Sequence, residues 1–99
     1  MIYEIAELTI KPDTHVAFEA AVAEAVPLFK RAKACLSMRL EHCSEQGERY
    51  HLVVGSETLD DHMVHFRNSA DFQEWRRLVG DYFAMPQKVV HMTEVVNGF

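Results

Sequence analysis

The sequence predicts an α+β domain in which helices cover one face of a four-stranded antiparallel sheet. The first observation is size, because 99 residues, 48% of them hydrophobic, are enough for one core and too few for two. The second is that several short segments have the apolar pattern of strands. The third is that other segments place apolar residues at intervals of three and four, as helices do. We therefore expect a single domain over residues 1–99.

The first helix is predicted after Pro12, before the next strand. One continuous apolar stripe, spaced by four, three, four and three residues, is formed by Phe18, Val22, Ala25, Phe29 and Ala32. This stripe is expected to lie on the sheet. Pro27 falls inside the pattern and cannot donate a helical hydrogen bond, which predicts either a kink or a break with a restarted last turn.

Residues 35–43 and 49–56 predict two strands joined by a turn, which makes an antiparallel hairpin. Leu36, Met38 and Leu40 are expected on one face of the first of them. Cys35 and Cys43 would lie roughly 26 Å apart at ~3.3 Å per residue, too far for a disulfide. Free thiols favour a reducing compartment.

The second helical region is predicted to be split. Thr58 and Asp61 resemble a capping box that opens a first piece, and Ser69 is a second N-cap. The second piece has Phe72, Trp75 or Arg76, and Val79 on one face and ends at Gly80. Residues 88–96 then predict the last strand.

The resulting order, β-α-β-β-α-β, is ferredoxin-like, and it leaves one face of the sheet open. The first and the last predicted strands carry apolar residues on both of their faces. In the first strand, one face has Ile2, Ala6, Leu8 and Ile10 and the other has Tyr3 and Ile5. In the last strand, one face has Val90, Met92 and Val96 and the other has Val89 and Val95. A second subunit is the simplest cover for the open face, so we expect a homodimer with two sheets packed face to face.

Charge and hydropathy exclude several classes of partner. The net charge is −5 and the basic residues are scattered, which excludes the phosphate-neutralising stripe of a nucleic-acid binder. No apolar run approaches the ~18 residues that a membrane helix requires, and the N-terminus lacks the pattern of a signal peptide. We expect a cytoplasmic protein without nucleic-acid or membrane partners.

One short stretch has a composition typical of a binding pocket. HMVHFRNSADFQEWRR, which begins at His62, contains two histidines, two phenylalanines, the only tryptophan and three arginines, and His91 follows it. Aromatic walls beside titratable rings and fixed cations suit a flat, acidic small molecule.

The run ETLDDHMVHFRNSADFQEWRRLVGDYF, followed by the strand that contains His91, resembles the antibiotic biosynthesis monooxygenase family, also called small quinol-monooxygenase-like proteins. The pairs that carry the resemblance are Asp61-His62, Phe66-Arg67 and Trp75-Arg76. The resemblance implies a dimeric α/β-barrel of ferredoxin-like subunits. It also implies oxygenation of a quinol or an aromatic polyketide by dioxygen, with no metal and no flavin cofactor.

The resemblance assigns a role to each candidate residue. His62 and His91 are the candidate catalytic bases, since the ordinary pKa of histidine, about 6.5, lies near working pH. Arg67 or Arg76 is expected to bind a phenolate or a carboxylate, and Phe66, Phe72 and Trp75 are expected to form the aromatic wall. This chain has Ser56 where many family members carry a tryptophan.

Each candidate also has a structural interpretation. His62 would cap a helix, His91 would be a buried histidine of the dimer interface, and Trp75 would belong to the core. Arg76 and Arg77 would pair with Asp71 and Glu74. Two other functions stay open: a cofactor-free isomerase of a small carbonyl compound, and a non-catalytic dimer that binds a small ligand.

Overall fold

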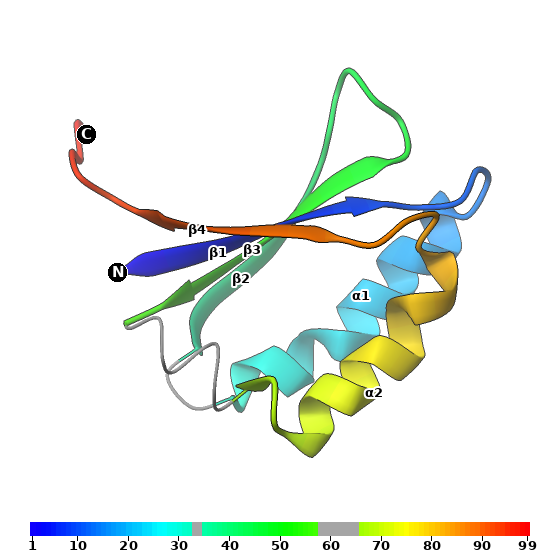
Figure 1. The fold of residues 1–99 in the computed structure, drawn as a ribbon, viewed down its shortest axis with the longest axis horizontal. Coiled ribbons are helices and arrows are strands. Elements are labelled where there is room, and N and C mark those ends of the chain that lie inside the picture. The colour runs from blue at the N-terminus through cyan, green and yellow to red at the C-terminus, as the bar shows by residue number, and fades with distance from the viewer. Residues whose placement is uncertain (33–34, 58–65) are drawn as a thin grey trace.

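Four antiparallel strands form one sheet, and two helices pack against one face of it (Figure 1). The computed structural model of the protein describes residues 1–32, 35–57 and 66–99. The elements are β1 (Ile2–Thr9), α1 (His15–Lys30), β2 (Cys35–His42), β3 (Arg49–Ser56), α2 (Ala70–Val79), the short 3-10 helix η2 (Gly80–Tyr82) and β4 (Lys88–Thr93). The predicted β-α-β-β-α-β fold is confirmed.

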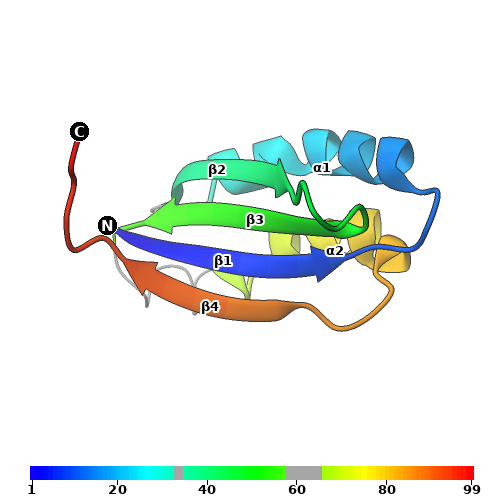
Figure 2. The ribbon, with the colours of Figure 1, turned by 90° about the horizontal axis from the view of Figure 1, so that it is seen from above.

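The strand order across the sheet is β2-β3-β1-β4, so β1 lies in the interior of the sheet (Figure 2). β1 pairs antiparallel with β3 on one side and with β4 on the other. Side chains alternate along a strand, so every second residue of β1 faces the helices. From Glu4 onwards these residues are buried, among them Ala6, Leu8 and, just beyond the strand, Ile10.

Helix α1 covers the sheet with the predicted stripe. Phe18, Val22, Ala25 and Phe29 are all buried, because the 3.6-residue repeat keeps them on the side of the sheet. The helix continues through Pro27 to Lys30, so the predicted alternative of a break with a restarted turn is wrong. Pro27 itself is exposed.

Two strands differ from their prediction. A shift in the β2–β3 register between Cys35 and Ser37 leaves Leu36 half exposed, although it still lines one hollow with Met38, and Cys35 packs against the core. β4 ends at Thr93 rather than at residue 96. Thr93 pairs with Ile2, the first residue of β1, and the partner strand goes no further.

The remaining predictions concern the ends of the second helix, the two cysteines and the absence of a membrane-spanning helix. Ser69 caps α2 by accepting a 3.2 Å hydrogen bond from the backbone N–H of Phe72, and Gly80 ends that helix, as expected. Cys35 and Cys43 are both free thiols. The predicted helix start at Thr58 and Asp61 lies outside the described residues. In the described part of the chain, no helix is long and apolar enough to span a membrane.

A close contact between strands generates a test of the sheet. Gly55 on β3 is paired with Tyr3 and with Ser37, and a Cβ at position 55 would overlap Ser37 Oγ. Gly55→Ala is expected to lower the free energy of unfolding by about 1–3 kcal/mol, measured by urea denaturation, because it overpacks this site. A Ser37→Ala background should remove most of that loss.

Gly47 is the matched control, since no atom lies within 4 Å of a Cβ built there. Gly47→Ala should leave the unfolding midpoint nearly unchanged. An equal loss for Gly55→Ala with and without Ser37 would show that the overlap is not the cause.

Candidate functional site

A buried carboxylate lies at the centre of the candidate site. Glu4 is 9% exposed and sits on the helix face of β1, in the same alternation as Ala6 and Leu8. A carboxylate is costly to bury unless positive or hydrogen-bonding groups surround it. Its environment therefore decides what the site does.

Two cationic or titratable side chains converge on one oxygen of Glu4. His91 is the residue directly opposite Glu4 on β4, and its Nε2 lies 3.5 Å from Glu4 Oε1. Arg67 Nη2 lies 3.6 Å from the same oxygen. His91 and Arg67 come from different segments of the chain. The pairing of β1 with β4 places the His91 imidazole beside Glu4.

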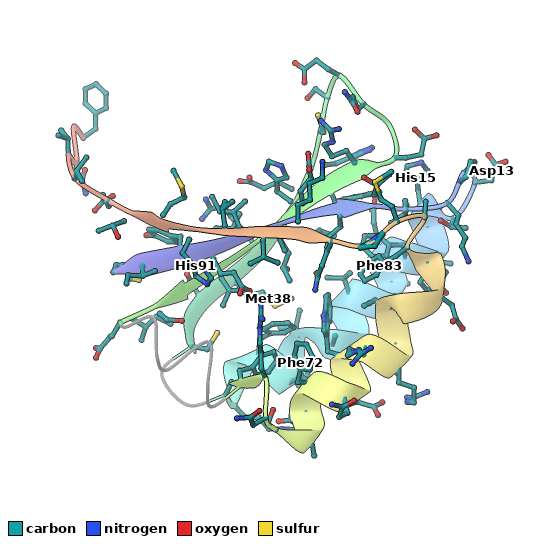
Figure 3. All side chains as sticks on the ribbon, in the orientation of Figure 1. Asp13, His15, Met38, Phe72, Phe83 and His91 are labelled. Carbon is teal, nitrogen blue, oxygen red and sulfur yellow. The ribbon has the colours of Figure 1, made fainter. Side chains whose placement is uncertain are left out.

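His91 faces the helices rather than the open face of the sheet. Val89, two residues earlier, pairs with Ala6 and packs against the core. Side chains two residues apart on a strand lie on the same face, so His91 lies on the core side as well. In Figure 3 the His91 label lies on the helix side of the β4 ribbon. His91 is therefore on the opposite side of the sheet from the face where a partner subunit is expected.

Aromatic side chains wall a small cavity above Glu4. The cavity has a volume of about 20 Å³, enough for one molecule of the size of water. Its polar lining is Glu4, Arg67 and Gln87, and its apolar lining is Ala6, Phe29, Leu52, Phe66, Phe72, Trp75 and Val89. The Phe66 ring is 4.9 Å from the Phe29 ring and meets Phe72 edge-on at 5.7 Å.

A larger hollow opens beside this inner cavity. It has a volume of about 380 Å³ and is lined by Phe72, Trp75, Arg76, Gly80, Phe83, Pro86 and Gln87. Phe72, Trp75 and Gln87 line both spaces, so they form the boundary between them. Together the two spaces make a pocket with an aromatic mouth and a polar inner end.

The start of α2 is held by hydrogen bonds that fix these rings. Ser69 Oγ donates to the carbonyl of Phe66 at 2.5 Å, in addition to capping the helix. Arg31 at the end of α1 donates two hydrogen bonds, of 2.9 and 2.7 Å, to the carboxylate of Asp71. These hydrogen bonds and the guanidinium charge hold the pKa of Asp71 below its usual range.

The structure brings together five of the seven predicted site residues at the inner cavity. Phe66, Arg67, Phe72 and Trp75 line it, and His91 lies against its Glu4 wall. Arg76 lines only the outer hollow. His62 lies outside the described residues.

The structural interpretations hold only for some residues. Trp75 is 4% exposed and belongs to the core, as that interpretation expected, and it also lines the pocket. Arg77 pairs with Glu74, whereas Asp71 pairs with Arg31 and not with Arg76. Ser56, the residue expected at the family tryptophan position, is 3% exposed and faces the helices opposite Ile2.

The sequence analysis missed Glu4. The signal was present, because Glu4 shares the parity of Ile2, Ala6, Leu8 and Ile10, the apolar set assigned to one face. A single carboxylate among the strand residues that face the core indicates a polar site inside that core.

The family model of antibiotic biosynthesis monooxygenases matches residues 1–78, most of the chain. The chain belongs to the antibiotic biosynthesis monooxygenase family. It is 35% identical over 95 residues to the uncharacterized Bacillus subtilis (strain 168) protein YczJ, with 96% of this chain and 100% of YczJ covered.

Solved structures agree with this membership. A crystal structure from Bordetella bronchiseptica, of a protein assigned to the antibiotic biosynthesis monooxygenases, is 52% identical with a TM-score of 0.94 and covers 96% of this chain and 97% of its own. The Nitrosomonas europaea structure assigned to the same family shares the fold at 23% identity and a TM-score of 0.81, covering 97% and 100%.

The Arg31–Asp71 pair predicts a pH dependence. The pKa of Asp71 is lowered in the folded protein, so the pair stabilises the fold above the ordinary carboxyl pKa, about 3.9, and this contribution is lost as pH falls through the lowered value. Arg31→Gln is therefore expected to reduce the loss of stability on acidification below about pH 3.9. The measurement is the urea midpoint at neutral and at acid pH.

Lys30→Gln is the control for this test, because it removes a neighbouring positive charge at the same end of α1 that forms no ion pair among the described residues. If both variants changed the pH profile equally, general charge rather than the Asp71 pair would be responsible.

Proposed function

We propose that this family member is a cofactor-independent monooxygenase that oxidises a quinol or a related hydroxylated aromatic with dioxygen. The observation that carries the proposal is the convergence of His91 and Arg67 on Glu4 at the inner end of an aromatic-walled pocket. The ring of a planar substrate would occupy the outer hollow beside Phe72 and Trp75, with its hydroxyl directed at this polar end.

In the proposed mechanism His91 takes the proton of the substrate hydroxyl. The imidazolium that forms lies 3.5 Å from Glu4, and the new phenolate is stabilised by Arg67. The site then holds two positive charges, on His91 and Arg67, and two negative charges, on Glu4 and the phenolate. The proton transfer therefore leaves the net charge of the site unchanged. His62 is the second candidate base.

The overall reaction balances without an added reductant. A quinol and dioxygen give a hydroxyquinone and water, and the quinol supplies all four electrons that reduce the two oxygen atoms. The protein's part is to bind the substrate, remove a proton and keep bulk water away from the electron-rich intermediate.

Oxygen uptake tests this proposal. With a panel of quinols and hydroxyanthrones in an oxygen electrode, the protein is expected to consume dioxygen above the rate of autoxidation without protein. His91→Ala should lower that rate by about 10²–10⁴, the usual contribution of a general base. His51→Ala is the matched control, because His51 lies on β3 with the parity of Val53 and Gly55, away from the pocket.

Each unfavourable result has a distinct meaning. Unchanged turnover in His91→Ala would refute the base assignment and direct attention to His62. Without oxygen uptake from any aromatic, the isomerase and the non-catalytic ligand-binding dimer would become the better candidates, and only the isomerase would convert a carbonyl substrate.

We also propose that the protein is a homodimer that buries the open faces of its sheets. Val90 and Met92 on that side of β4 are 53% and 52% exposed, and the C-terminal tail carries three more exposed apolar residues, Val95, Val96 and Phe99. Exposed apolar side chains in this number favour a partner.

Light scattering on a sizing column is expected to give twice the mass of one chain. Val90→Glu should shift the protein towards the monomer, because a charge would be buried at the interface. Val16→Glu, a change to an exposed valine on α1, is the matched control. A monomeric parent protein would contradict the proposal.

A further inference from the structure

Arg76 differs from the other arginines of the chain. Five of the six arginines lie within 4 Å of a carboxylate, in the pairs Arg31–Asp71, Arg39–Glu41, Arg49–Glu7, Arg67–Glu4 and Arg77–Glu74. Arg76 has no such partner among residues 1–32, 35–57 and 66–99. Its charge is available for a ligand.

Arg76 lies where its charge can contact a ligand in the outer hollow. Arg76 lines the outer hollow of about 380 Å³ together with Trp75 and with Phe83, which belongs to the segment that leads to β4. Figure 3 shows Phe72 on α2 and Phe83 on that later segment, on the same side of the sheet. A guanidinium beside aromatic rings suits a planar anion, because it can bind a carboxylate through two parallel hydrogen bonds.

The inner end of the pocket has the opposite preference. Glu4 presents a buried carboxylate there, and Arg67 already lies beside it. A substituent that is already anionic when it enters brings no proton to His91, unlike the hydroxyl of the proposed reaction, so Glu4 would repel it and it would lose its hydration. A neutral hydroxyl, in contrast, can donate a hydrogen bond to Glu4 or a proton to His91.

We propose that the ligand is a hydroxylated aromatic acid whose carboxylate binds Arg76 at the mouth while its hydroxyl points inward to His91 and Glu4. The outer volume lies in the range of about 300–1,000 Å³ that is usual for small-molecule sites. The placement of the hydroxyl rests on the proposed oxygenase function, whereas the recognition of the carboxylate by Arg76 does not.

Calorimetric titration with two matched probes tests the carboxylate. The probes are 6-hydroxy-2-naphthoate and 6-hydroxy-2-naphthamide, which share the ring and the hydroxyl and differ in charge. The parent protein is expected to bind the acid about 10-fold more tightly than the amide, since a hydrogen bond to a charged group contributes roughly that much. Added salt should reduce the preference, because the anchor lies at the surface.

Arg76→Gln should abolish the preference, because the acid should lose far more affinity than the amide. Arg77→Gln is the matched control, because Arg77 is the next residue of the same helix, pairs with Glu74 and does not line the hollow. It should keep the preference. Equal affinity of the two probes for the parent protein, a preference that survives Arg76→Gln, or binding of neither probe would overturn the proposal.

Oxygen uptake separates this inference from the proposed function. A preference for the acid without oxygen uptake would support the anchor and count against the oxygenase. Oxygen uptake without a preference for the acid would do the reverse.

Discussion

The pairing of β1 on both of its edges is the constraint on which the rest of the structure depends. A strand bonded on both sides has only two directions for its side chains, and β1 must turn its apolar set towards the helices. Glu4 follows the same parity and enters the core with Ala6 and Leu8. The polar inner end of the pocket is thus a consequence of the register, and a slip by one residue would move it to the other face.

The walls of the pocket are also part of the core. Trp75 packs edge-on against Phe29 at 5.1 Å, and the same indole separates the inner cavity from the outer hollow. Helix α2 therefore has two roles that cannot be separated by mutation of its buried face. Of the described α2 residues that line the pocket, Arg76 is the exposed one and lies outside that packing.

Much of the fold was predictable because it follows local periodicity, and the stripe of α1 and the cap at Ser69 are examples. The rest depends on neighbours in space. The bulge beside Leu36 and the end of β4 at Thr93 are set by the register with other strands. In the site, the aromatic and arginine cluster could be named from one stretch, but the partnership of Glu4 with His91 could not, because only the assembled sheet makes them neighbours.

Glu4 and His91 belong to the first and last strands of the chain, and this has a consequence for synthesis on the ribosome. β1 can pair with β3 as soon as the hairpin has emerged, but its other edge stays unpaired until residues 88–93 have left the exit tunnel. The sheet and the pairing of Glu4 with His91 at the inner end of the pocket are therefore completed in the same step. A nascent or truncated chain that lacks β4 has no His91 beside Glu4, so β4 supplies the last part of the site that we propose.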